Sequence, residues 1–239
     1  MPKAIVIGAS SGIGKALAQV LAREGYEVGL TARRLDRLLE IQKEIKSQIP
    51  PKRIDVTDTS KAQEALKDLI DEMEDVDLII VNAGVLFNNR DFEWEKEKLT
   101  IETNVLGFAA MAQTAMEYFL SRGEGHLVGM SSISAIRGES DSPSYSASKA
   151  FVSNFLEGLR MKAYKAKKEI CVTDIKPGWV DTDMAKGEQT FWMASPEKAA
   201  QQIYSAIKHK RSHAYITRRW RLIAWLLKCL PSKLYLRYY

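Results

Sequence analysis

The sequence has few of the residues that stabilise secreted or fibrous proteins. Only Cys171 and Cys229 occur in 239 residues, so no disulfide framework can be derived from them. Seven prolines and 14 glycines are too few for a disordered or fibrous chain. No apolar run reaches the roughly 18 residues that indicate a membrane span, and no signal-peptide pattern follows Met1. We therefore expect a globular protein in a reducing, cytosolic location.

Acidic residues are absent from the end of the chain. From Lys208 to Tyr239 the sequence contains Lys and Arg but no Asp or Glu, whereas the rest of the chain is slightly acidic. The net charge of +5 and the pI of about 9.0 therefore reflect a basic tail and say little about the main domain.

Short apolar runs alternate with segments of helical periodicity. Strands are predicted at 4–7, 28–31, 53–56, 78–81, 126–131, 170–175 and 213–217, and helices at 16–23, 35–45, 61–73, 100–118, 145–165 and 196–208. Continuous apolar strands without alternation are typical of a parallel sheet covered on both faces. The pattern predicts an α/β protein with a Rossmann-type doubly wound sheet of about seven strands. One domain would occupy residues 1–217, and residues 218–239 would form a helical extension.

A glycine-rich loop follows the first predicted strand and opens the first helix. Its spacing, G-x-x-x-G-x-G, is a variant of the dinucleotide fingerprint. Glycines permit a tight turn and a close approach of the backbone to a pyrophosphate, and the helix N-terminus offers free N–H groups to the anion. A glycine-rich turn without a ligand is the alternative, but the position after the first strand of a βαβ unit disfavours it. The candidate cofactor residues of this loop are Gly8, Ser10, Ser11, Gly12, Ile13 and Gly14.

The second strand ends without the carboxylate that would bind the ribose 2′-hydroxyl of NAD. Arg33 and Arg34 stand there instead, and guanidinium donors match the geometry of a phosphate. We therefore predict NADP(H) as the cofactor, with solvated surface arginines as the alternative. Lys15 is a weaker candidate, because a lysine at a helix start is usually solvated.

Four polar residues form a candidate catalytic set. Tyr145 and Lys149 are four residues apart on a predicted helix, so their side chains share one face. Ser132 ends the preceding strand, and strand carboxyl ends are where ligands bind in open α/β sheets. Asn104 falls within an earlier helix. The pair Tyr145 and Lys149 alone is weak evidence, because such pairs occur by chance.

Together these motifs resemble the short-chain dehydrogenase/reductase family over roughly residues 3 to 217. No single motif is decisive, but the set occurs in the family's order and spacing. The pieces that carry the resemblance are Gly8-x-x-x-Gly12-Ile13-Gly14, Asp55-Val56, Asn82-Ala83-Gly84, Asn104, Ser132, Tyr145-x-x-x-Lys149 and Pro177-Gly178-x-Val180-x-Thr182.

The resemblance implies a role for each catalytic residue. Tyr145 would be the general acid in reduction and the base in oxidation, and a nearby Lys149 charge would favour its ionised form. Lys149 would also hold the nicotinamide ribose. Ser132 would bind the substrate oxygen, where negative charge grows. Asn104 would bend its helix and hold a water that links Lys149 to solvent.

The resemblance also implies cofactor contacts beyond the glycine loop. Asp55 and the Val56 backbone would lie at the adenine, and Tyr145 and Lys149 at the nicotinamide. The adenosine side of the cleft would be lined by Asn82, Ala83 and Gly84. The nicotinamide loop would contain Pro177, Gly178, Val180 and Thr182. We predict no metal site.

Two positions depart from the family pattern. Ile7 stands where the family usually has Thr, and Val81 stands where it usually has Asn. We expect Ile7 and Val81 to lie side by side on neighbouring strands, where an apolar contact replaces a polar one. The chemistry of the site would be unaffected.

The segment 183–194 resembles the family's mobile lid over the substrate. It holds large apolar side chains, which favour an apolar carbonyl or alcohol substrate. These side chains could instead pack as core. Ser132 and Tyr145 would contact the substrate, together with the lid residues Met184, Phe191 and Trp192.

The basic tail combines apolar and cationic side chains. Helical spacing would give it an apolar face with basic flanks, which could lie in an anionic membrane interface or pack on the protein itself or across a dimer. Nucleic acid binding is disfavoured, because no further motif is present. The apolar residues are Trp220, Leu222, Ile223, Trp225, Leu226, Leu227 and Leu230, and the basic ones are Arg218, Arg219, Arg221, Lys228, Lys233 and Arg237.

The resemblance implies a homo-oligomer, a dimer or tetramer, in which helices near 100–120 and 145–165 pair across two-fold axes. The leading interpretation is an NADP(H)-dependent carbonyl reductase or alcohol dehydrogenase. A non-catalytic dinucleotide-binding regulator or scaffold is the first alternative, but it would have no need of Ser132. An epimerase working through a keto intermediate is the second.

Overall fold

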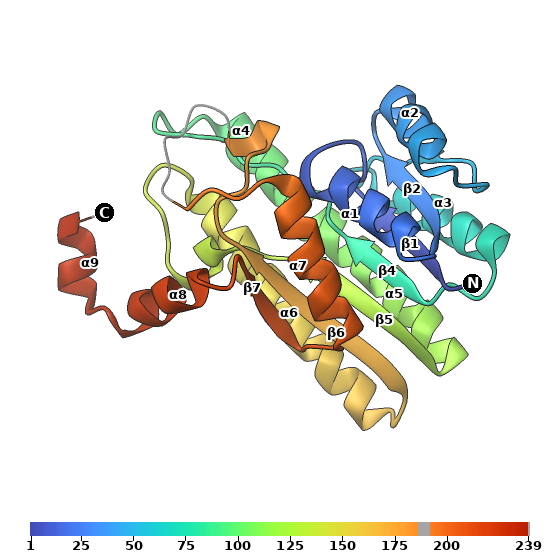
Figure 1. The fold of residues 1–239 in the computed structure, drawn as a ribbon. Helices are drawn as coiled ribbons and strands as arrows, with labels where there is room; N and C mark the ends of the chain where they lie inside the picture. Colours follow the sequence, from blue (N-terminus) through green and yellow to red (C-terminus); the bar gives the residue numbers. More distant parts are fainter. Residues whose placement is uncertain (186–191, 239) are drawn as a thin grey trace.

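The computed structural model describes residues 1–185 and 192–238. In these ranges, seven parallel strands form one sheet in the order β3-β2-β1-β4-β5-β6-β7, with helices on both faces (Figure 1). The predicted doubly wound α/β fold is therefore confirmed. The strands are β1 (Lys3–Ile7), β2 (Glu27–Ala32), β3 (Lys52–Arg53), β4 (Leu78–Val81), β5 (Glu124–Met130), β6 (Glu169–Pro177) and β7 (His213–Ile216).

Helices connect the strands and cover the sheet. Helices α1, α2 and α7 pack on one face, and α3, α5 and α6 pack on the other. The helices of the main fold are α1 (Gly12–Arg23), α2 (Leu35–Ile45), α3 (Thr59–Met73), α4 (Trp94–Ile101), α5 (Phe108–Arg122), α6 (Pro143–Lys165) and α7 (Pro196–Lys208). The short turns are the π-helical η1 (Glu102–Gly107) and the 3₁₀ turns η2 (Ile133–Ile136) and η3 (Asp183–Ala185).

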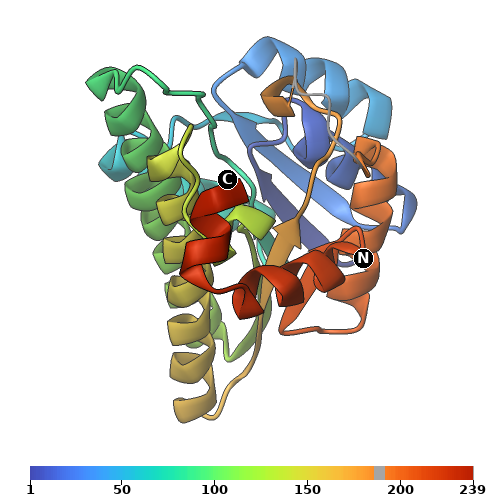
Figure 2. The same cartoon turned by 90° about the vertical axis from the view of Figure 1, so that its left-hand side faces the viewer.

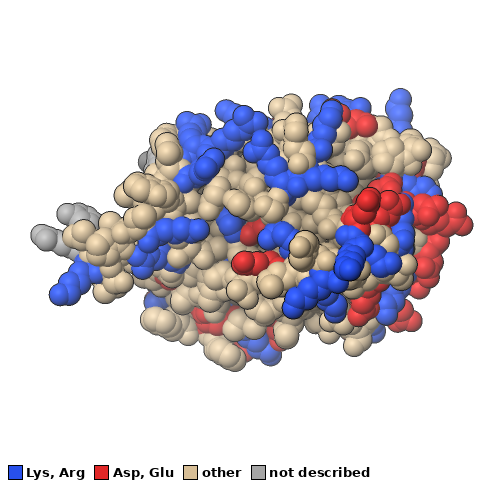
Figure 3. Space-filling model, turned by 90° about the horizontal axis from the view of Figure 1, so that it is seen from below, with Lys and Arg blue, Asp and Glu red and all other residues tan. Residues whose placement is uncertain are grey.

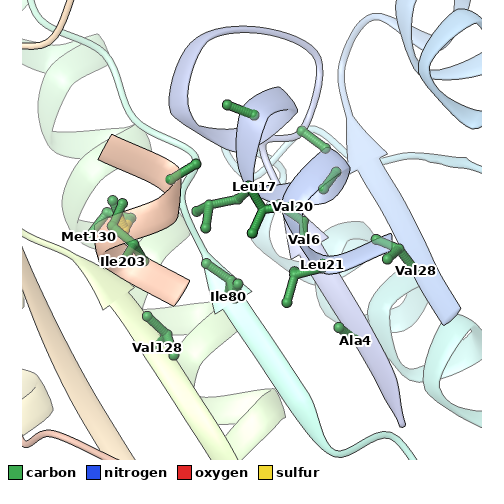
Figure 4. Close-up of a cluster of buried hydrophobic side chains, with 14 of the residues drawn as sticks. Ala4, Val6, Leu17, Val20, Leu21, Val28, Ile80, Val128, Met130 and Ile203 are labelled. Atoms are coloured by element: carbon green, nitrogen blue, oxygen red, sulfur yellow. The ribbon is translucent and has the colours of Figure 1, made fainter. Parts of the chain in front are cut away.

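Alternate residues of a strand pack on opposite faces of the sheet. Ala4 and Val6 of β1 join one apolar cluster, whereas Ile5 and Ile7 join the other, because successive side chains of a strand point to opposite faces. Figure 4 shows side chains of α1 and α7 against those of β1, β4 and β5 in the first cluster. Since both faces are buried, β4 is apolar at every position and β1 is apolar from Ala4 to Ile7.

The prediction for the two departures from the family pattern is confirmed. Ile7 and Val81 are register partners on the adjacent strands β1 and β4, and both side chains are buried. Their contact is apolar and belongs to the core beneath the site.

Helix ends follow the sequence signals. Asp58 accepts a hydrogen bond from the Lys61 backbone at the start of α3, and Ser195 does the same for Lys198 at α7. Helices α2 and α7 have the predicted bounds.

Two predicted elements differ from the structure. The strand predicted at 53–56 ends at Arg53, because the Asp55 carboxylate accepts hydrogen bonds from the backbone and hydroxyl of Thr57 and turns the chain. The helix predicted at 100–118 begins at Trp94 and is interrupted by η1. A π-helical turn of this kind has no signature in apolar periodicity.

The C-terminal extension forms α8 (Trp220–Cys229) and α9 (Ser232–Tyr238). Both lie beside the β7 edge of the sheet and cross the front of the molecule in Figure 2, between α6 and α7. Within 1–185 and 192–238, no helix is long and apolar enough to cross a membrane.

Candidate active site

A cleft of about 570 Å³ opens at the carboxyl ends of the central strands. It contains the residues that follow β1, β2, β3 and β4, since parallel strands all end at the same edge. Most predicted cofactor residues line it: Gly8, Ser10, Ser11, Gly12, Ile13, Arg33, Arg34, Asp55, Val56, Asn82, Ala83, Gly84 and Thr182.

The glycine loop forms the floor of the cleft at the start of α1. Gly8 has φ +89°, and its N–H donates to Thr31 O at 2.8 Å. The Asn82 side chain donates to Gly8 O at 2.8 Å and so ties the loop to the end of β4. Gly14 lies beneath the cleft, and a Cβ there would stand 2.1 Å from Gly8 O. This closeness leaves room only for glycine.

Arg34 lies directly over the glycine loop. Its Nη2 donates to the Ser10 hydroxyl at 3.0 Å and to the Ser11 hydroxyl at 2.9 Å. Arg33 lines the same cleft, and both guanidiniums are exposed. Lys15 instead forms an ion pair with Glu44 at 2.9 Å. Two arginine side chains therefore form a positive rim on the β2 side of the cleft.

Asn104 lies in η1 and joins the β4 side of the cleft to α6. Its amide nitrogen donates to Val85 O at 2.8 Å and to Ser148 Oγ at 3.1 Å, while its oxygen accepts from Val85 N at 2.8 Å. The side chain is 1% exposed. A Cβ built on Gly84 would lie 3.2 Å from Asn104 Oδ1 and 3.4 Å from Lys149 Nζ. Asn104 and Lys149 therefore meet at Gly84.

Ser132 and Tyr145 form a hydrogen-bonded pair at the end of β5. Ser132 is buried and begins η2, where its Oγ accepts from Ser134 N at 3.1 Å. Burial raises the pKa of Tyr145 to about 12, and the nearby Glu139 adds to this, whereas the hydrogen bond with Ser132 acts in the opposite direction. The phenol is therefore protonated at neutral pH, as a general acid must be.

Lys149 lies on the same face of α6 as Tyr145. Its ammonium donates to Met130 O at 3.0 Å and stands 5.5 Å from the centre of the Tyr145 ring. Burial lowers the pKa of Lys149 to about 8, and the buried Asp174 carboxylate partly offsets this. The Lys149 ammonium therefore lies close to the phenol whose ionised form it is expected to favour.

The predicted nicotinamide loop follows β6. Thr182 reaches the cleft opposite the glycine loop, since a Cβ on Gly12 would stand 3.0 Å from Thr182 Cγ2. Val180 is buried and bridges to Ala194. Pro177 ends β6, and a Cβ on Gly178 would lie 2.2 Å from the Trp220 indole. The tail therefore covers one side of this loop.

The three predicted lid residues have different surroundings. Met184 lines the cleft and is 42% exposed. Trp192 packs edge-on against Trp220 at 6.2 Å, with the Arg219 guanidinium 5.2 Å from its ring. Phe191 lies outside the described residues. Met184 thus faces the cleft, whereas Trp192 contacts the tail.

Comparison with known proteins places this geometry in a family. The model of the short chain dehydrogenase family matches residues 2–191. The chain belongs to the short-chain dehydrogenase family. An uncharacterized oxidoreductase of Mycobacterium tuberculosis is 33% identical over 246 residues, which cover 99% of this chain and 96% of the relative. The chain is accordingly an oxidoreductase of a family that uses a nicotinamide cofactor.

Solved structures of the family share the fold. A short-chain type dehydrogenase/reductase from Mycobacterium marinum superposes with a TM-score of 0.83 at 24% identity, covering 96% of each chain. A short-chain dehydrogenase from Sphingobium yanoikuyae, solved in complex with NADPH, gives a TM-score of 0.80 at 21% identity, covering 97% of each chain.

Several cleft residues were not found by sequence reasoning. Thr103 is the most informative, because its buried hydroxyl has no hydrogen-bond partner within the described ranges and it lines the cleft. A buried hydroxyl without a protein partner fits a site that holds a polar ligand, and a dinucleotide cofactor would be such a ligand. Its position beside Asn104 could have indicated it. The other lining residues that were not predicted as site residues are Ile7, Ala32, Ile54, Val85, Leu86, Phe87 and Asp183.

The Gly14 contact predicts a stability effect. We expect Gly14→Ala to lower the free energy of unfolding by roughly 2 kcal/mol, because the new methyl overlaps the Gly8 carbonyl. Gly158→Ala is the matched control, since Gly158 also lies in a helix but has open space around its Cβ position. It should raise stability by up to about 1 kcal/mol. Urea unfolding measures both, and similar shifts for the two variants would contradict the close approach.

Proposed function

We propose that this chain is an NADP(H)-dependent oxidoreductase that interconverts a ketone or aldehyde and an alcohol by hydride transfer. The observation that carries the proposal is the convergence of Ser132, Tyr145, Lys149 and Asn104 beside a cleft lined by the glycine loop and two arginines. Neither the polar side chains alone nor the cleft alone would require redox chemistry. A site for a hydride donor next to a buried acid does require it.

Different residues of the cleft would bind different parts of the cofactor. The glycine loop and the start of α1 would hold the pyrophosphate, because backbone N–H groups and the positive end of a helix favour an anion. Arg33 and Arg34 would hold the 2′-phosphate. Asp55 and Val56 would contact the adenine. When bound, NADPH supplies the hydride that the carbonyl carbon receives.

The catalytic residues manage the proton and the charge on the substrate oxygen. Ser132 donates a hydrogen bond to that oxygen, and Tyr145 transfers its phenolic proton to it during reduction. A positive Lys149 then stabilises the tyrosinate that forms. Asn104, which is positioned by its contacts with Val85 and Ser148, would hold the water that links Lys149 to solvent. Protons would reach the site through this water.

An apolar substrate fits part of the cleft lining. Leu86, Phe87 and Met184 line the cleft, and Met184 is 42% exposed. Accessible apolar groups in a site favour a ligand that can bury them. The substrate class is therefore a hydrophobic carbonyl compound or alcohol, and a screen of ketones graded in size and apolarity is the direct way to define it.

Two further proposals concern assembly and location. Helices α5 and α6 would pair between two copies, giving a dimer or tetramer, and the exposed Leu106 of η1 and Met161 of α6 support such a face. A cytoplasmic location agrees with Cys171 and Cys229, neither of which forms a disulfide in the described structure.

Tyr145→Phe tests the reaction class. The variant should lose at least about a hundredfold in turnover, because no acid remains to protonate the substrate oxygen, while its affinity for NADPH stays close to wild type. Tyr164→Phe, on the exposed surface of the same helix, is the matched control and should keep full activity. Substantial turnover by Tyr145→Phe would refute the role of Tyr145 as the acid. A wild-type protein that binds NADPH but turns over no substrate would favour the non-catalytic alternative.

The pKa of Lys149 predicts how reduction depends on pH. Lys149 carries its charge below about pH 8 and loses it above, so kcat/KM for NADPH-dependent reduction should decline as the pH rises through about 8. Asp174 raises the Lys149 pKa, and the isosteric Asp174→Asn should therefore move this decline to lower pH. Parallel pH profiles of the two proteins measure this shift. An unchanged or higher midpoint in the variant would contradict the assignment.

The arginine rim predicts the cofactor preference. Arg33→Ser and Arg34→Ser should each weaken NADPH binding on the order of tenfold, because each removes a charge-assisted contact to the 2′-phosphate. Binding of NADH should change little. Lys15→Ser is the matched control, since this lysine pairs with Glu44. Titration calorimetry measures the affinities, and equal losses for NADPH and NADH in the arginine variants would end the phosphate assignment.

A further inference from the structure

Helix α8 is apolar on two opposite faces. Trp220 and Ala224 form its inner face and are buried on the protein. Its outer face carries Leu222, Trp225 and Leu226, which are 69%, 66% and 51% exposed. An apolar helix face normally packs on another surface. Since the domain covers only the inner face, the outer face is left for another surface.

The orientation of α8 is fixed by contacts at its inner side. The Trp220 indole packs against Gly178. At the other end of the helix, Arg137 donates from Nε to Leu227 O at 3.0 Å and from Nη2 to Leu230 O. The Tyr235 hydroxyl of α9 donates to Gly138 O at 2.6 Å. These contacts at both ends prevent α8 from rotating to bury its outer face on its own domain.

A basic edge borders the outer face. Arg218, Arg221 and Lys228 are exposed, and no ion pair to a carboxylate is formed by any of them in the described part of the chain. Arg218 and Arg221 line a second cleft, of about 320 Å³, together with Arg211 and His213. Figure 3 shows the largest group of acidic side chains on the right of the molecule, and no Asp or Glu follows Glu197 in the sequence. The potential around α8 is therefore positive.

We propose that the outer face of α8 docks on an anionic membrane surface. Ten residues span about 15 Å, half of a bilayer core of about 30 Å, so the helix would lie in the plane of the interface. Trp225 and the two leucines enter the boundary between headgroups and acyl chains, and the arginines at the second cleft bind lipid phosphates. An amphipathic helix with a tryptophan and a cationic flank has the composition of such an anchor.

The same charge argues against a second copy as the occupant. In a two-fold interface each patch faces itself, so Arg218, Arg221 and Lys228 would approach the identical residues of the other copy. No Asp or Glu occurs after Glu197 in the sequence to compensate them. Anionic lipid phosphates supply the missing negative charge. The docking does not depend on the proposed reaction, because lipid binding can be measured without turnover.

Vesicle flotation of the full-length chain tests the proposal. The wild type should float with vesicles of equal parts phosphatidylglycerol and phosphatidylcholine, and high salt or pure phosphatidylcholine should abolish this. The double variant Trp225→Asp with Leu226→Asp should lower the bound fraction at least roughly tenfold, since two inserted apolar groups are lost. Arg218→Ser with Arg221→Ser should lower binding to the anionic vesicles by about the same factor.

Leu39→Asp is the matched control, because Leu39 is 43% exposed on α2, away from the tail. It should float like the wild type, and circular dichroism should show all variants folded. Absence of wild-type flotation would overturn the proposal, as would equal flotation of the Trp225 and Leu226 variant. If the wild type does not float and light scattering shows a lower mass for the Trp225 and Leu226 variant, the outer face would form a contact between copies. That result would also overturn the proposal.

Discussion

The amide of Asn104 holds the two halves of the site together. Its three hydrogen bonds join the backbone of Val85, just after β4, to Ser148 in the first turns of α6. The segment after β4 lines the cleft, and α6 carries Tyr145 and Lys149. A buried amide whose donors and acceptor are paired in this way allows one arrangement of the two elements. The π-helical turn η1 places the amide at this point.

Burial sets the protonation of Tyr145 and Lys149. It raises the pKa of Tyr145 and lowers that of Lys149, so the phenol keeps its proton while the ammonium titrates closer to neutrality. Asp174 limits the fall for Lys149. This carboxylate is itself held by Ser131, Ser153 at 2.6 Å, and Lys176. This polar network holds the Asp174 carboxylate in place, and the carboxylate affects the site only through its charge, which raises the pKa of Lys149.

Local signals in the sequence predicted the sheet and its helices well. The apolar strands could be read from their own residues, and the pairing of Ile7 with Val81 followed from the family pattern. The glycine loop, Arg34 and Tyr145 carry motifs with a fixed spacing, so they were predicted too. Thr103 was missed because the sequence does not show that its hydroxyl is buried without a partner in the described part of the chain. Asp174 was missed because its effect on the pKa of Lys149 acts across the fold. The same holds for Arg137, which reaches α8 about ninety residues later.

The central claim is that these residues direct a hydride to a carbonyl carbon and a proton to its oxygen. Reduction of an apolar ketone with NADPH deuterated at the reactive C4 position tests it directly. Mass spectrometry and NMR should find one deuterium in the product alcohol, on the former carbonyl carbon, in amounts equal to the NADPH consumed. NADPH that is bound but transfers no deuterium to any ketone in the graded series, or a product whose new hydrogen on carbon comes from solvent, would contradict the account.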